Sequence, residues 1–194
     1  MKRFLILNVV FAAIAFTACN SNNNKTDEST DMKSDTAQSK MQTSGTETKS
    51  TASINEIVAG YLNVKNALAS DNGKEAATAG KEIVNAMNKL DKASLTAEQK
   101  KVYEDVEDEA KEHAQHISTN ADKIDHQREH FDMLSQDMYD LVKTFGAGQT
   151  LYKDFCPMYN NNKGAAWLSE TKEIKNPYLG KKMSDCGSIK EEIK

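Results

Sequence analysis

Four apolar stripes with helical spacing constrain the fold of this chain more than any other feature of its sequence. Between residues 54 and 145, apolar residues recur at alternating steps of three and four, a spacing that places side chains on one face of an α-helix. The stripes are Ile54, Ile57, Tyr61, Val64 and Leu68; Ala76, Ala79, Ile83, Ala86 and Leu90; Tyr103, Val106, Ala110, His113 and Ile117; and Ile124, Phe131, Leu134, Met138, Leu141 and Phe145. Because short polar turns favour antiparallel neighbours, the sequence predicts an all-α fold, an up-down four-helix bundle.

Turn and cap signals mark where these helices begin and end. Asp71-Asn72-Gly73 separates the first two stripes, and Gly146 follows the fourth. Thr96, with Gln99 three residues later, predicts a capping box at the start of the third helix. The helical spacing fails after Gly148, so we expect residues 149–194 to form an irregular tail that needs packing or a cross-link to hold it down.

The N-terminus has the pattern of an export signal. A short basic start and an apolar run ending at Phe16 predict a signal peptide over residues 1–18, because the run is too short to span a bilayer stably. Cys19 resembles the lipid-modified cysteine of bacterial lipoproteins, and Asn20 after it favours the outer membrane by the same resemblance. The alternative is an ordinary signal peptide with an incidental cysteine. We therefore expect a lipid-anchored protein of the cell envelope that faces the periplasm.

The segment after the lipidation site is too polar to form a core. Residues 20–52 contain scarcely an apolar side chain, so the lipidated cysteine and this segment (19–52) are predicted to be a disordered tether. Residues 53–194 then form one domain. The net charge of −4, without a basic stripe, argues against a nucleic-acid partner.

Motifs that would indicate catalysis do not stand out. Serine, histidine and aspartate lie on polar helix faces, and the sequence has no glycine-rich phosphate loop and no His-Glu-x-x-His. The sequence therefore does not favour an enzyme.

Two short sulfur motifs in the tail are the first candidate metal ligands. Cys156-Pro157-Met158 and Met183-Ser184-Asp185-Cys186 each place two sulfurs close together. Thiolate and thioether ligands together favour Cu(I). The alternative is a Cys156–Cys186 disulfide with Met158 and Met183 as ordinary core residues. Composition alone does not choose between the two interpretations.

The histidines are the second group of candidate ligands. All four lie between residues 110 and 130, where the third and fourth helices should meet as antiparallel neighbours. His126 and His130 share one stripe with Met133, and His113 takes a core position, so these three histidines are candidate ligands. His116 should point about 60° away from His113 and be solvated. Four nearby carboxylates fit a charged face better than a supporting role at a metal: Glu112, Asp122, Asp125 and Glu129.

The segments HQREHFDMLSQDMYDLVKTFG and LYKDFCPMYNNNKGAAWLSETKEIKNPYLGKKMSDCG resemble a bacterial domain family formally of unknown function. The family occurs as small exported lipoproteins and as a domain fused to periplasmic adaptor subunits of copper/silver and other heavy-metal efflux systems. The resemblance covers residues 55–194 and implies metal handling, with copper as the first choice. An efflux adaptor or another periplasmic metal carrier is then the implied partner.

Taken together, the motifs predict an exported Cu(I)-binding lipoprotein that buffers the metal or passes it to an efflux system. Cys156 and Cys186 would bind the ion with a methionine or a histidine. One alternative is a module stapled by a disulfide, without metal. Another is a zinc module with tetrahedral ligands Cys156, Cys186, His126 and His130.

Overall fold

The computed structural model describes the backbone of residues 46–194 and the side chains of residues 54–194. The predicted signal peptide, the proposed lipidation site Cys19 and the predicted tether as far as residue 45 lie outside the described residues. The first helix begins at Thr46. Residues 46–52, which the sequence assigned to the tether, are therefore helical.

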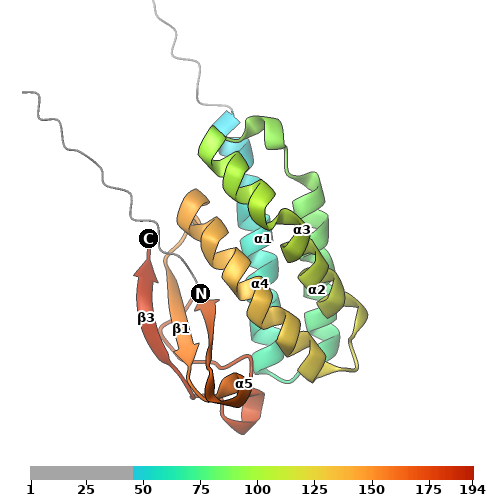
Figure 1. Cartoon of the computed structure of the whole chain (residues 1–194), viewed down its shortest axis with the longest axis vertical. Helices are drawn as coiled ribbons and strands as arrows, with labels where there is room; N and C mark the ends of the chain where they lie inside the picture. The colour runs from blue at the N-terminus through green and yellow to red at the C-terminus, as the bar shows by residue number, and fades with distance from the viewer. Residues whose placement is uncertain (1–45) are drawn as a thin grey trace, which may run out of the picture. The chain divides into compact units, whose positions relative to one another are not determined.

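Four long helices lie side by side (Figure 1): α1 (Thr46–Ala69), α2 (Gly73–Lys89), α3 (Ala97–Thr119) and α4 (Ile124–Phe145). Each helix packs on the next along the chain, and α1 also contacts α4. A short 3₁₀ turn, η1 (Lys92–Ser94), leads into α3. The predicted helical bundle is confirmed for this part of the chain.

The predicted helix ends agree with the hydrogen bonds at those ends. Thr96 accepts a bond from the Gln99 amide, and the Gln99 side chain accepts one from the Thr96 amide, which completes the predicted capping box. Asn72 caps α2 by accepting a bond from the amide of Glu75. Gly146 ends α4 with a φ of 74°, a backbone conformation that glycine adopts without steric cost.

The apolar stripes form one core. Most of the predicted positions are almost fully buried, whereas Ile124, Phe145 and His113 are only half-buried. The largest fully buried hydrophobic side chains of the helices are Tyr61, Tyr103, Phe131, Ile54, Ile57, Leu68, Ile83, Met87, Ile117 and Leu134. The hydrophobic effect of burying these faces is the main force that holds the helices together.

The tail is not irregular, which corrects the all-α prediction. It forms a three-stranded antiparallel sheet of β1 (Leu151–Cys156), β2 (Ala165–Ser169) and β3 (Ser188–Ile193), with β1 in the centre. A short turn, α5 (Tyr159–Asn162), joins β1 to β2, and η2 (Gly180–Lys182) lies before β3. The protein is thus a mostly helical bundle with a small sheet.

The sheet packs against α4 and α1, chiefly through β2 (Figure 1). Trp167 and Leu168 of β2 are each 1% exposed and belong to the same core as the helices. The Tyr61 hydroxyl accepts a hydrogen bond from the Leu168 amide at 3.0 Å and also bonds the Ser135 hydroxyl at 2.8 Å. One hydroxyl therefore connects α1, α4 and the sheet.

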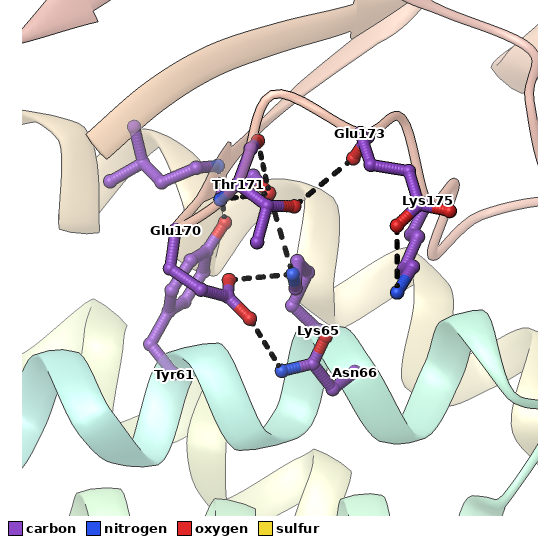
Figure 2. Close-up of polar contacts among 9 residues, drawn as sticks. Tyr61, Lys65, Asn66, Glu170, Thr171, Glu173 and Lys175 are labelled. Atoms are coloured by element: carbon purple, nitrogen blue, oxygen red, sulfur yellow. Dashed lines mark hydrogen bonds and ion pairs between the residues drawn. The ribbon is translucent and has the colours of Figure 1, made fainter. Parts of the chain in front are cut away.

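A buried lysine adds a charged contact at this interface. Lys65 of α1 is 0% exposed, and its Nζ lies 2.7 Å from Oε2 of Glu170, just after β2 (Figure 2). Asn66 donates a second bond to Glu170 at 2.9 Å. The ammonium group is thus buried with a counter-charge, as a lysine in this position requires.

Asp154 is the unusual residue of the central strand. It is 0% exposed, and neither carboxylate oxygen has a hydrogen-bond partner among the described residues. It lies opposite Trp167 on β2 and Ile189 on β3. Burial raises the pKa of Asp154 to about 6, while the charge of Lys65 acts in the opposite direction.

This raised pKa predicts a stability that depends on pH. Because the folded-state pKa lies above the unfolded value of about 3.9, the folded protein holds this proton more tightly. The contribution is fully present below about pH 4 and is lost as the pH rises through about 6. Asp154→Asn removes the titration, so the free energy of unfolding of the variant minus that of the wild type should increase between pH 4 and 6 and then level off. Urea unfolding across pH 4–8 measures it, and a difference independent of pH would contradict the assignment.

Candidate metal centre

The turn between α3 and α4 brings the four histidines to one end of the bundle. His113 and His116 lie in the last turns of α3, and His126 and His130 lie in the first turns of α4. The buried side chain of Gln127 fixes the two helix ends, because its amide donates to the Ile117 carbonyl and to the Gly73 carbonyl, each at 2.9 Å. The start of α4 is thereby tied to the end of α3 and to the start of α2.

Three imidazoles converge at this end. His116, His126 and His130 each offer one ring nitrogen, and these three atoms all lie within 4.8 Å of one another. The rings of His116 and His130 are stacked with centroids 4.1 Å apart, and the ring of His126 stands edge-on to His130 at 4.5 Å. All three side chains are half-buried. Three nitrogen ligands this close together are what a metal site with three protein ligands requires.

Neighbouring groups orient these rings. Nδ1 of His113 lies 3.1 Å from Nδ1 of His130, and Nδ1 of His126 lies 3.3 Å from Glu129. Nδ1 of His130 and Nδ1 of His126 therefore each have a polar neighbour. Contacts of this kind fix the tautomer and ring orientation of ligating histidines.

Electrostatics keeps the central imidazole uncharged. Burial, together with the neighbouring histidines His116, His126 and His113, lowers the pKa of His130 to about 4. Burial also lowers the pKa of His113. A neutral imidazole has a free lone pair, so His130 is ready to bind a metal at neutral pH without first losing a proton.

The structure adds one residue to the predicted histidine ligands. The side chain of His116, which we expected to be solvated, is 43% exposed, yet it belongs to the group of three, whereas His113 contacts the group through His130. The sequence gives only the direction in which His116 points around α3, and it does not show which part of α4 lies next to that direction. The rings of His126 and His130 on α4 lie beside that flank of α3 and partly cover His116. Of the four nearby carboxylates, Glu129 contacts His126, and Glu112 lies 3.9 Å from His116.

The two cysteines of the tail come together elsewhere. Cys156 ends β1 and Cys186 precedes β3; their sulfurs are 2.9 Å apart, and both are free thiols. The backbone N–H of Met158 contacts both sulfurs, while its side chain is 50% exposed, and Met183 is half-buried. Neither thioether takes part in the described contacts of the cysteine pair.

The sulfur and imidazole ligands therefore form two separate groups. Among the described residues, the group of ligand atoms that lie within 4.8 Å of one another contains the three histidines and neither cysteine. The fold therefore does not bring together the four ligands of the predicted tetrahedral zinc site, which were Cys156, Cys186, His126 and His130. The proposed sulfur ligation of Cu(I) by the cysteines stays a prediction.

A cavity of about 520 Å³ lies on the neighbouring face of α4, between that helix and the α5 turn. Glu129 and Met133 line it from α4, and Tyr159 lines it from α5. Glu129 thus contacts His126 and also lines the cavity.

The α5 turn beside the cavity has an unusual backbone. Asn160, Asn161 and Asn162 have φ values of 52°, 55° and 63°, a left-handed run that asparagine tolerates better than most residues.

No described helix is both long and apolar enough to cross a membrane.

The comparison with curated proteins found no match, and neither did the comparison with solved structures. Residues 57–150 match the model of a family described as "Protein of unknown function (DUF3347)". The part of the chain that is similar to this family of unknown function contains all four histidines and ends before the two cysteines of the sheet.

Proposed function

We propose that this protein binds a transition-metal ion through His116, His126 and His130. The observation that carries the proposal is the convergence of three imidazole nitrogens within 4.8 Å on two adjacent helix ends. A group of imidazoles with a supporting carboxylate at Glu129 suits a borderline metal ion, not the hard cations Mg²⁺ and Ca²⁺.

Copper is the first choice of metal, and zinc is the second. Both accept imidazole ligands, and among divalent first-row ions Cu²⁺ binds most tightly to a given set of nitrogen ligands. Three protein ligands leave a coordination position for water or for a ligand of another protein. A site of this kind suits a protein that holds a metal ion and releases it to a partner.

The cellular role follows from the sequence features. The predicted signal peptide and the lipid anchor at Cys19 support a location in the cell envelope, with the domain on the periplasmic side of the outer membrane. The resemblance to domains fused to heavy-metal efflux adaptors supports a role in buffering metal or passing it to such an adaptor or to another periplasmic carrier. In this proposal the protein is a carrier and not an enzyme.

Metal titration of single variants tests the site. We expect His116→Ala, His126→Ala and His130→Ala each to weaken Cu²⁺ and Zn²⁺ binding at least tenfold, because each removes one of three ligands. His113→Ala should weaken binding less, since it removes only an orienting contact. Competition against a chromophoric chelator measures the affinities, and circular dichroism confirms that each variant is folded.

The matched control is the double variant Cys156→Ser/Cys186→Ser, which removes the sulfur pair and leaves the histidines in place. It should bind Cu²⁺ with wild-type affinity. Wild-type affinity in all three histidine variants, together with loss of binding in the cysteine variant, would overturn the histidine site. A parallel competition with Cu(I) under reducing conditions tests the sulfur ligands predicted from the sequence.

A further inference from the structure

Cys156 and Cys186 are thirty positions apart in the sequence, yet their sulfurs lie 2.9 Å apart. We infer that these two residues form a reversible disulfide that fastens residues 170–187, here called the strap, to the central strand of the sheet. The strap connects β2 to β3, and its one helical turn is η2. This inference goes beyond the proposed metal site and does not depend on it.

The backbone around Cys186 is held in place independently of its sulfur. Asn176 is 0% exposed, and its side-chain Nδ2 donates a hydrogen bond to the Cys186 carbonyl at 2.6 Å. The backbone N–H of Asn176 donates to the Ser184 carbonyl at 2.8 Å. Its Oδ1 accepts bonds from the amides of Tyr178 and Leu179. The fold therefore presents the two sulfurs to each other before any bond forms, which removes much of the entropic cost of pairing them.

The two thiols have different surroundings. Burial acts to raise the pKa of Cys156, but the Cys186 thiol, the amides of Met158 and Tyr159 and the side chain of Asn176 outweigh it, so the net pKa is lowered. The contact with Cys156, together with burial and the charge of Asp185, raises the pKa of Cys186 to about 11. Cys156 is therefore the more acidic of the two thiols and the one that loses its proton more readily. Cys156 is 0% exposed, whereas Cys186 is partly exposed.

This asymmetry gives an order of events with a disulfide oxidant, such as oxidised glutathione or the disulfide of a thiol oxidase. Cys186 is the sulfur that the oxidant can reach. Once it has lost its proton, it attacks the oxidant disulfide and forms a mixed disulfide, and one half of the oxidant leaves as a thiolate that takes up a proton. The Cys156 thiolate then attacks the Cys186 sulfur and releases the second half. Two protein S–H bonds and the oxidant S–S bond break, and one protein S–S bond forms. Both electrons and both protons end on the two thiols of the reduced oxidant.

Thiol counting in glutathione buffers tests the inference. The experiment uses the full chain with Cys19→Ser, which leaves two cysteines. We expect the folded protein to lose both titratable thiols while it remains a monomer. The ratio of oxidised to reduced glutathione at which this happens should be at least tenfold lower than the ratio needed in denaturant. Oxidation should also slow amide hydrogen exchange in the strap, with little change in α2 and α3. Cys186→Ser in the same background is the control, and it should keep one titratable thiol and show no change in exchange on oxidation.

Three outcomes would overturn the inference. The first is two thiols that stay titratable in oxidised glutathione alone, which would return the cysteines to the Cu(I) site predicted from the sequence. The second is oxidation that yields only covalent dimers. The third is an oxidation midpoint that is the same for folded and unfolded chains, because the fold would then not favour disulfide formation between Cys156 and Cys186. The Cu²⁺ affinity of the oxidised protein should equal that of the reduced protein, so failure here is distinguishable from failure of the histidine site.

Discussion

Replacing Glu170 with glutamine should lower the free energy of unfolding by roughly 2–4 kcal/mol. The change leaves the Lys65 ammonium, which is 0% exposed, without its nearest counter-charge. Removing one partner of a fully buried ion pair costs about 3–5 kcal/mol. We expect less here because the Glu170 side chain is 29% exposed and the Asp154 carboxyl also lies near Lys65. Urea unfolding at pH 7 measures the change.

Two further variants show whether the cost comes from the unpaired charge. Lys65→Met combined with Glu170→Gln removes both charges and keeps a side chain of similar length, so it should recover most of the lost stability. Glu104→Gln breaks the exposed Lys100–Glu104 pair on α3 and should cause no measurable change. A double variant no more stable than Glu170→Gln alone would show that the cost does not come from the charge of Lys65.

Replacing Leu134 with alanine should lower the free energy of unfolding by about 2–5 kcal/mol, the range for large-to-small changes in a well-packed core. Leu134 is 0% exposed on the face of α4 that packs into the shared core of the helices and the sheet. The deletion removes buried apolar surface and leaves a cavity that its neighbours fill only in part. Thermal or urea unfolding measures the loss.

Met133 is the matched control for this prediction. It is the preceding residue on the same helix, but its side chain is 39% exposed. Met133→Ala should therefore change the stability by less than about 1 kcal/mol. Equal losses for the two variants would mean that the face of α4 that carries Leu134 is not the buried one.

The helices could be predicted because their signals are local. Burial on one face repeats every three to four residues, and the capping box needs only Thr96 and Gln99, so both are readable in a single sequence. The strands lack a comparable signal. β1 buries a charged residue, Asp154, and has a register irregularity between Lys153 and Asp154. β3 is mostly exposed and charged, so it shows no clear alternation of apolar and polar residues.

The candidate site was partly predictable for a similar reason. The spacing of His126 and His130 places them on one stripe of a helix, whatever that helix contacts. The inclusion of His116 depends on how α4 is rotated against α3, which pairs of residues such as Gln127 and Ile117 determine. The approach of Cys156 to Cys186 likewise depends on the pairing of β1 with β3. The sequence suggested that the two residues belong together, but not what they form.

The double hydrogen bond of Gln127 has a consequence for local unfolding. Since one side chain holds the start of α2, the end of α3 and the start of α4, these three helix ends should fray together as a single cooperative unit. The histidine ring nitrogens that would bind a metal ion belong to two of those ends. An ion bound between them would lower the population of the opened form by mass action. The exchange rate of amide protons around Ile117 would then report metal occupancy from inside the bundle, without a spectroscopic signal from the metal itself.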